Sequence, residues 1–302
     1  MTAIRLIALD LDGTLLASDG TLSARVERAI REARARDVVV TLATARRWTG
    51  ATPYARQLDL TAPLILYDGA LVRTFPHGET QLQRTLKPDL AQRAAETIAQ
   101  WELQVVAQHA APHGERLVAS EDPPHPKWMA PYLASFREQA TRAPLDRIAT
   151  VSPETLRLVS FGPIKRLRGA FDALGDAPVG RQILPLGSYG LAELTVFSPD
   201  SSKGSGLRWL ARRLGIPMSQ TLAIGDGVND VSMLRAAGLG IAMGNAAPEI
   251  QAEANGVTAP NDEDGAALAI ERYVLDGEGA EASEEMRDDL DGALDDETEE
   301  TA

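Results

Sequence analysis

The sequence of 302 residues contains no cysteine. This absence excludes disulfides, a cysteine nucleophile, and zinc or iron–sulfur sites with cysteine ligands. Aromatic residues are also few, at 5% of the total, and no apolar run reaches the roughly 18 residues that a membrane span requires. The apolar run at residues 4–9 is broken by Asp10 and is too short for a signal peptide. We therefore expect a cytoplasmic protein that neither spans nor binds a membrane.

Two nucleotide-binding signatures are missing as well. The sequence has no phosphate-binding loop of the form Gly-x-x-x-x-Gly-Lys-Ser/Thr, and the glycines at positions 238, 240 and 244 do not have the spacing of a dinucleotide-binding loop. Chemistry driven by nucleotide hydrolysis or by hydride transfer therefore has no support in the sequence.

Nearly all of the negative net charge lies in residues 276–302. The formal net charge is −13, but residues 276–302 contain thirteen acidic residues and one arginine, so this tail carries −12 and the remainder carries −1. A nearly neutral body lacks the concentrated Lys and Arg that attract nucleic acid or anionic membranes, and we expect neither as a partner. Because residues 276–302 are acidic and contain no aromatic residue, we predict that they are disordered.

What is present is an alternation of short apolar runs and amphipathic stretches, with 44% hydrophobic residues to fill a core. Residues 4–9, 38–44 and 64–67 have the continuous apolar character of buried strands, and apolar residues recur at helical spacing over 26–33. The same alternation returns over 203–275. This rhythm predicts an α/β fold with a doubly wound parallel sheet of the Rossmann-like kind.

The middle of the chain differs from both ends in composition and in residue pattern. Residues 83–192 combine a helical stretch, strand-like runs and loops rich in proline and histidine. We predict that they form a smaller α/β domain inserted into a discontinuous core of residues 1–82 and 193–275. Three of the four histidines, His109, His113 and His125, lie in this insert, where we expect them in surface loops.

Two acidic motifs follow predicted strands. Asp10-Leu11-Asp12-Gly13-Thr14 comes directly after the first strand, and Gly225-Asp226-Gly227-Val228-Asn229-Asp230 comes after a strand predicted over 221–224. Ligands bind at the carboxyl ends of strands in open parallel sheets, and carboxylates are ligands that Mg²⁺ prefers. Asp-Gly pairs also form ordinary turns, so that each motif alone leaves both interpretations open.

Three further residues are suited to holding a phosphate group. Thr44 ends the second predicted strand with Arg46 close behind it, and Lys203 stands at the start of a predicted helix, where free N–H groups favour an anion. Each has a simpler interpretation as a capping residue or a solvated charge. Lys203 is the more informative, because the chain has only four lysines among thirty basic residues.

The order of these motifs resembles the haloacid dehalogenase superfamily of phosphatases. The matching segments, in chain order, are Asp10-x-Asp12-Gly13-Thr14-Leu15-Leu16, Thr44-Ala45-Arg46, Lys203-Gly204 and Gly225-Asp226-x-x-Asn229-Asp230. Additional matches point to its Cof-type branch, which carries an α/β cap domain for substrate specificity between the second and third motifs. These are Asp68-Gly69-Ala70, Ala242-Met243-Gly244-Asn245-Ala246 and Asn261-Asp262-Glu263-Asp264-Gly265. The insert at 83–192 lies where that branch has its cap.

The resemblance implies a role for each matching residue. Asp10 would be the nucleophile that becomes an aspartyl-phosphate, and Asp12 the general acid and base. Thr44, Arg46 and Lys203 would hold the phosphate group. The metal ligands for Mg²⁺ would be the Asp10 carboxylate, the Asp12 backbone carbonyl and Asp226, supported by Asn229 and Asp230.

The resemblance also implies a class of reaction. The leading hypothesis is a Mg²⁺-dependent phosphatase that hydrolyses a small phosphorylated metabolite, such as a sugar phosphate or a cofactor phosphate. The alternative is a phosphotransferase or phosphomutase that uses the same aspartyl-phosphate. A binding protein without activity is disfavoured, because all four motif aspartates are present. Nothing in the sequence indicates the physiological substrate or the oligomeric state.

Two positions depart from the family pattern. Ala45 replaces the usual glycine of the second motif, and Asp68 replaces the usual asparagine of an Asn-Gly-Ala loop. Asp68 adds a negative charge close to the predicted cleft, which puts in doubt any substrate contact inferred for that position.

Overall fold

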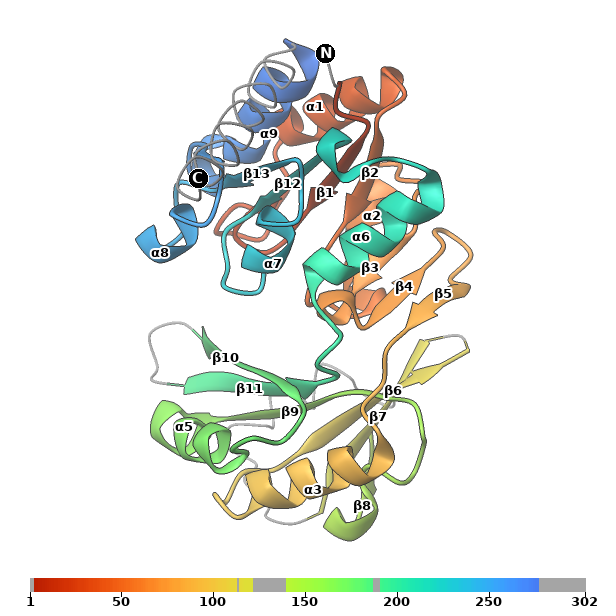
Figure 1. The fold of residues 1–302 in the computed structure, drawn as a ribbon, viewed down its shortest axis with the longest axis vertical. Helices are drawn as coiled ribbons and strands as arrows, with labels where there is room; N and C mark the ends of the chain where they lie inside the picture. The colour runs from red at the N-terminus through yellow and green to blue at the C-terminus, as the bar shows by residue number, and fades with distance from the viewer. Residues whose placement is uncertain (1–2, 113, 122–139, 187–190, 277–302) are drawn as a thin grey trace, which may run out of the picture.

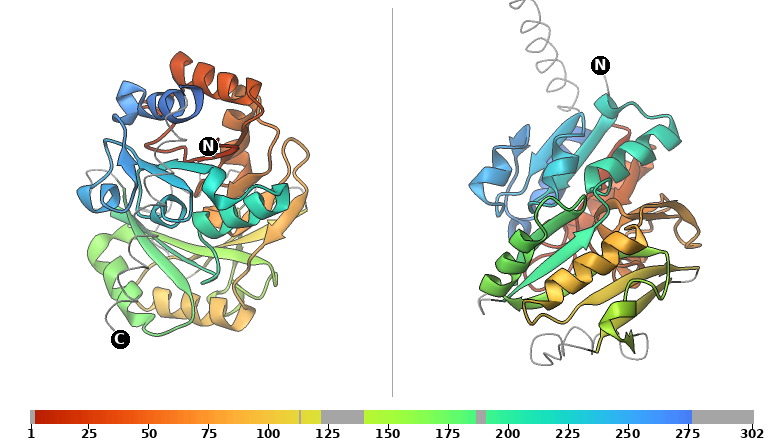
Figure 2. Two further views of the ribbon diagram at one scale, coloured as in Figure 1. Left: turned by 45° about the horizontal axis from the view of Figure 1, so that its top comes forward. Right: turned by 60° about the horizontal axis from the view of Figure 1, so that its bottom comes forward.

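The computed structural model describes residues 3–112, 114–121, 140–186 and 191–276. They form two parts, drawn in the upper and lower halves of Figure 1 and seen from two further sides in Figure 2. We call them the core and the cap. All but the first residue of the acidic tail, together with His113 and His125, lie outside the described residues.

The core is built on a parallel sheet with the strand order β14-β13-β12-β1-β2. Every neighbouring pair of strands in it is parallel. Its strands are β1 (Leu6–Leu9), β2 (Val39–Leu42), β12 (Thr221–Gly225), β13 (Leu239–Ala242) and β14 (Gly256–Val257). The four residues of β1 are all buried, as its continuous apolar character predicts.

Helices cover both faces of this sheet, and each face has its own hydrophobic cluster. On one face lie α1 (Ala24–Ala35), α2 (Trp48–Gln57) and α9 (Gly265–Ile270), the last continued by the π-helical turn η7 (Glu271–Leu275). On the other lie α6 (Lys203–Leu214), α7 (Val231–Leu234) and α8 (Pro248–Gln251). The predicted doubly wound α/β fold is confirmed.

A small antiparallel sheet extends the core beside β2. It consists of β3 (Leu64–Leu66), β4 (Leu71–Arg73) and β5 (Thr80–Gln83), and a parallel bridge from Ala43 to Ile65 joins it to the end of β2. The short turn η1 (Tyr67–Gly69) connects β3 to β4, and its three residues all have positive φ angles.

The cap has a six-stranded mixed sheet in the order β10-β11-β9-β6-β7-β8. The strands are β6 (Val106–Ala111), β7 (Gly114–Ser120), β8 (Ala140–Ala143), β9 (Thr155–Pro163), β10 (Gly180–Leu186) and β11 (Leu191–Phe197). Helices α3 (Pro88–Ala99) and α5 (Ile164–Ala173) pack on the face that is turned away from the core (Figure 1). Its other face is therefore turned toward the core. Other short 3-10 turns in the described part of the chain are η3 (Leu145–Arg147) in the cap, and η5 (Met218–Gln220) and η6 (Asn261–Glu263) in the core.

Two predictions about the insert need correction. Strand β11 pairs with β9 and β10 along its whole length, so the cap sheet continues to Phe197 rather than ending at residue 192. Ala192, Leu194 and Val196 bury in the cap cluster, which holds this strand in the cap. His109 is not in a surface loop but fully buried in β6, with its Nδ1 atom 3.1 Å from the Thr155 hydroxyl.

Among the described residues, none of the helices combines the length and the apolar character needed to cross a membrane.

Candidate active site

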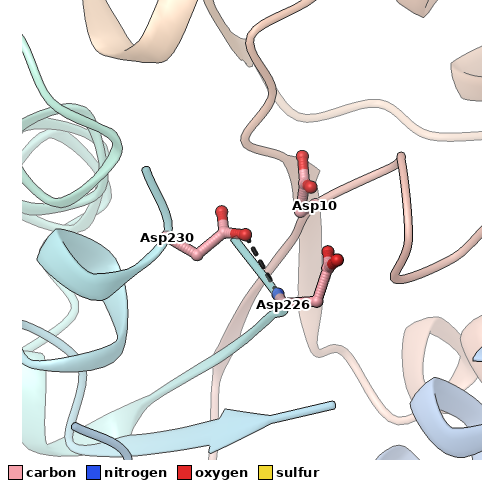
Figure 3. Close-up of side chains that lie close together, drawn as sticks. All are labelled: Asp10, Asp226 and Asp230. Carbon is pink, nitrogen blue, oxygen red and sulfur yellow. Dashed lines mark hydrogen bonds between the residues drawn. The ribbon is translucent and has the colours of Figure 1, made fainter. Parts of the chain in front are cut away.

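The site lies at the carboxyl ends of two strands that are neighbours in the parallel sheet. Strands β1 and β12 pair in register, with Leu9 opposite Ile224. Asp10 follows β1 directly, and the loop from Asp226 to Asp230 follows β12. Figure 3 shows Asp10, Asp226 and Asp230 gathered at this edge, although more than 200 residues of chain separate the two motifs.

Lys203 is the cation at the centre of this group. Its Nζ atom lies 2.8 Å from Asp10 Oδ1 and 2.6 Å from Asp230 Oδ1. Lys203 and Asp230 are fully buried, and Asp10 is 5% exposed. Lys203 occupies the first turn of α6, whose start is fixed by a capping box between Ser202 and Ser205.

Burial and charge shift the pKa values of these groups strongly. Burial alone would lower the pKa of Lys203, but the carboxylates of Asp10 and Asp230 outweigh it and raise that pKa above its ordinary value. Burial, and then the charge of Asp230, raise the pKa of Asp10 well above its ordinary range, and Lys203 opposes this rise only in part. The same two causes raise the pKa of Asp226 to about 6. Acidic groups crowded in this way favour a bound cation.

Asp230 holds the loop as well as the lysine. Its Oδ1 atom accepts from Lys203, and its Oδ2 atom accepts the backbone N–H groups of Asp226 at 3.0 Å and of Gly227 at 2.8 Å. Both oxygens of this buried carboxylate are therefore used inside the protein. This geometry suits the supporting role that we predicted for Asp230.

The three aspartates have the composition of a Mg²⁺ site. One carboxylate oxygen from each of Asp10, Asp226 and Asp230 can be chosen so that all three lie within 4.8 Å of one another. Gly13 makes room beside Asp226: it has a φ of +77°, and a Cβ atom there would lie 2.2 Å from Asp226 Oδ2. Thr14 donates to Asp226 Oδ1 at 3.0 Å and orients that carboxylate. Carboxylate oxygens are hard ligands of the kind that Mg²⁺ prefers.

Asp12 and Arg46 form a separate pair. The Arg46 guanidinium donates from Nε to Asp12 Oδ2 at 2.8 Å and from Nη2 to Asp12 Oδ1 at 2.6 Å. The Asp12 side chain is 59% exposed, and its hydrogen bonds raise the pKa of Arg46 further. Both residues that we predicted for proton transfer and phosphate binding are thus present near the site, but in this conformation they bind each other.

Thr44 and Asn229 contact their own surroundings. Thr44 is fully buried, and its hydroxyl accepts the N–H of Arg46 at 3.1 Å, which shapes the turn after β2. Asn229 donates from Nδ2 to Asp68 Oδ1 at 2.9 Å. The described contacts therefore bring Asp10, Asp226, Asp230 and Lys203 together in one cluster and place the other predicted residues around it. The catalytic, phosphate-binding and metal-binding roles of all these residues remain predictions.

Three contributors had no role in the sequence prediction. Thr14 orients Asp226, and Asn245 ties the two acidic loops together, because its Nδ2 donates to the Gly13 carbonyl at 2.9 Å and to Asp226 Oδ2 at 3.4 Å. Asp68 was noted only as a departure from a family pattern, yet it contacts both the loop after β12 and the cap. Thr14 and Asn245 lie inside matched motifs, so a signal was present for them; Gln182, the cap residue that Asp68 binds, lies in none.

Comparison with known proteins identifies the family. The profile of the haloacid dehalogenase-like hydrolases matches residues 7–270. An HMP-PP phosphatase of Serratia proteamaculans is 30% identical over 254 residues, which cover 82% of this chain and 86% of that protein. The phosphatase YwpJ of Bacillus subtilis is 28% identical over 291 residues, which cover 87% and 98%.

Solved structures agree with this fold. A haloacid dehalogenase-like hydrolase from Bacillus subtilis superposes with a TM-score of 0.73 at 25% identity, covering 89% of this chain and 99% of that one. A HAD subclass IIB sugar phosphatase superposes with a TM-score of 0.73 at 22% identity, covering 89% and 98%. The chain belongs to the haloacid dehalogenase-like hydrolases. The predicted superfamily, its branch with an inserted α/β cap, and the assignment to hydrolases are confirmed.

Proposed function

We propose that this protein is a Mg²⁺-dependent phosphatase that hydrolyses a small phosphorylated metabolite through an aspartyl-phosphate on Asp10. The observation that carries the proposal is the buried Lys203, bonded to Asp10 and Asp230 beside Asp226, at the edge of the sheet where ligands bind in such folds. A carboxylate is a weak nucleophile toward a phosphate monoester, whose negative charge repels it. Positive charge at this position removes that obstacle.

In the first step, the Asp10 carboxylate attacks phosphorus. Lys203 occupies Asp10 Oδ1, which leaves Oδ2 to form the new bond. The phosphorus–oxygen bond to the leaving alcohol breaks, and Asp12 donates a proton to that oxygen. In the second step, water attacks the aspartyl-phosphate and gives a proton back to Asp12. The products are the free alcohol and inorganic phosphate, and Asp10 is restored.

Lys203 has one donor left for the substrate. An ammonium group has three N–H donors, and Asp10 and Asp230 use two of them. The third has no partner among the described residues and would bind a phosphate oxygen, and we propose the same role for Arg46 and the Thr44 hydroxyl. Because Asp10 and Asp230 hold the ammonium group in place, it needs no reorganisation as charge develops on the transferring group.

Mg²⁺ would be held by the carboxylates of Asp10 and Asp226 and by the backbone carbonyl of Asp12, with Asp230 and Asn229 behind them. When bound, it neutralises charge on the phosphate oxygens and orients the phosphoryl group for attack. Thr14 donates to the Asp226 side chain and Asp230 accepts the Asp226 backbone N–H, so both would hold Asp226 in place as a ligand.

The proposed substrate class follows from the cap and from the relatives. The core residues named above bind only phosphate, so the part of the substrate beyond phosphate must meet the cap sheet, whose free face is turned toward the core. Relatives of this chain include proteins named for phosphatase action on HMP-PP and on a sugar phosphate. Both names fit a small phosphorylated metabolite, either a cofactor phosphate or a sugar phosphate.

Removal of the metal tests the proposal. We expect the protein to release inorganic phosphate from a member of a panel of phosphorylated metabolites when Mg²⁺ is present. EDTA should lower this rate at least about 100-fold, and excess Mg²⁺ should restore it. Turnover that persists without metal would contradict the proposal. Analysis of the products by phosphorus NMR separates hydrolysis from the alternative, because a phosphotransferase or mutase yields a moved phosphoryl group instead of free phosphate.

A further inference from the structure

Among the described residues, the contacts between the cap and the core include two groups. At the first, the turn between β6 and β7 is anchored: Arg73, which is 1% exposed, donates to the Ala111 carbonyl at 2.5 Å, and Glu115 accepts the N–H of Trp48 at 2.8 Å. Trp48 begins α2, so Glu115 satisfies a free N–H at a helix N-terminus. These contacts join buried groups and secure one end of the cap sheet.

At the second place the contact runs through the turn η1. The Arg157 guanidinium of β9 lies 4.9 Å from the centre of the Tyr67 ring, and Gln182 of β10 donates from Nε2 to Asp68 Oδ2 at 3.1 Å. Gln182 is near the opposite edge of the cap sheet from the anchored turn. A rotation of the cap about the anchored turn would therefore separate Gln182 from Asp68.

Asp68 accepts one hydrogen bond from another core residue and one from a cap residue. It is 4% exposed, and its two oxygens accept from two side-chain amides: Oδ1 from Asn229 and Oδ2 from Gln182. A carboxylate has only acceptors, so both amides must turn their NH₂ groups toward it. Asn229 belongs to the same loop as Asp226 and Asp230. The position of the cap is thus tied by one side chain to the loop of the proposed metal site.

The turn that carries Asp68 is held in an unusual conformation. Tyr67 and Asp68 both have a φ of 51°, in a region that costs an L-residue roughly 1 kcal/mol or more. Gly69 follows with a φ of +85°, and a Cβ atom there would lie 2.0 Å from the Ser202 carbonyl oxygen. The turn therefore packs closely against Ser202, the residue before Lys203. It has little freedom to follow the cap if the cap moves.

We propose that Asp68 is a positioning residue that latches the cap, through Gln182, to the loop carrying Asp226 and Asp230, so that a closed cap and an ordered loop form together. Its effect on catalysis rests on the proposed function, whereas its effect on the position of the cap does not. The carboxylate at this position, which departs from the family pattern, is explained by its two amide partners.

The test exploits the absence of cysteine. Replacing Arg31 on α1 and Arg93 on α3, both exposed, by cysteine allows one spin label on the core and one on the cap, and electron–electron double resonance then measures the distance between them. In the full-length protein we expect one narrow distribution. Gln182→Glu places a carboxylate against Asp68, and we expect the distribution to broaden and shift to longer distances. The control Gln100→Glu makes the same change at an exposed cap position and should leave it unchanged.

The double variant Asp68→Asn/Gln182→Glu reverses donor and acceptor. The amide introduced at 68 can donate to the carboxylate introduced at 182 and still accept from Asn229, so we expect the narrow distribution to return. A thermal melt confirms that each variant is folded. The latch is refuted if Gln182→Glu leaves the distribution unchanged, or if the double variant is as broad as Gln182→Glu alone.

Kinetics separate the latch from the proposed function. With the substrate found in the metabolite panel, we expect Gln182→Glu to lower kcat/KM at least fivefold and the double variant to recover to within about twofold of wild type. If no ester is hydrolysed by any variant while the distances behave as expected, the proposed function fails and the latch stands. If the distances do not respond, the latch fails whatever the activity.

Discussion

Lys203 is one of four lysines in the chain and is fully buried. An isolated ammonium group in such a place would cost several kcal/mol, and it is tolerated because Asp10 and Asp230 lie within 2.8 Å of it. The two carboxylates depend on Lys203 in turn, because they are themselves buried and repel each other. Removing the cation therefore leaves two buried acids without a partner.

Lys203→Met keeps the length of the side chain and removes its charge. We expect it to lower the free energy of unfolding by about 3–5 kcal/mol, the range for breaking a buried ion pair, and to abolish phosphate release. Urea titration measures the first and a phosphate assay the second. Lys165→Met on α5 is the matched control, because Lys165 is exposed and should change stability by less than about 0.5 kcal/mol. Equal effects of the two substitutions would contradict the role of Lys203.

The pair of Asp12 and Arg46 shows a different use of charge. Asp12 is exposed, so its ion pair with Arg46 adds little to stability despite good geometry. The pair holds the predicted acid and base against a residue that is predicted to bind phosphate.

At the level of secondary structure, strand β6, which pairs with β9, contains a buried histidine. His109 is fully buried, and burial lowers its pKa from 6.5 to about 4. The folded state therefore holds His109 neutral. As the pH falls below 6.5, the unfolded chain takes up a proton that the folded protein does not, so this group reduces the free energy of unfolding progressively between about pH 6.5 and pH 4.

His109→Gln keeps a polar group for the Thr155 hydroxyl and cannot titrate. We expect the stability of wild type relative to this variant to fall by about 3 kcal/mol between pH 7 and pH 4, as the size of the pKa shift requires. Urea titrations at several pH values measure the difference. The control is His77→Gln, which makes the same replacement at an exposed position outside the cap sheet. A constant difference between wild type and His109→Gln would contradict the account.

For the molecule as a whole, the core could be predicted because its motifs are local. Asp10 and Asp226 each follow an apolar run, and the rule that parallel strands end at one edge brings them together without further information. The ion pair between Asp12 and Arg46 could not be predicted, because the sequence does not show which charged side chains become neighbours in space.

The junction of cap and core was the harder part. Gln182 and Asp68 are 114 positions apart, and neither the strand patterns nor the motifs of the sequence predict their contact. The end of the cap could not be placed correctly for a related reason. The residue pattern of β11 fits a strand of either domain, and only the pairing of β11 with β9 and β10 assigns it to the cap.

The acidic tail, residues 276–302, carries −12 of the net charge of −13 and contains no aromatic residue. Truncation after Leu275 should therefore leave kcat/KM within about twofold and the melting temperature within about 2 °C of the full chain. Calorimetry and the phosphate assay measure both, and a large loss in either would show that the tail contributes to the folded enzyme.

The proposed function depends on Asp10 as the nucleophile, and this role can be tested by replacing its carboxylate with an amide. Asp10→Asn removes the charge with almost no change of volume, while Asp172→Asn makes the same change at an exposed position of α5. With the folded state checked by urea titration, the account predicts that Asp10→Asn lowers kcat by at least about 1,000-fold and that Asp172→Asn has no effect. An Asp10→Asn variant that retains activity within tenfold of wild type would contradict it.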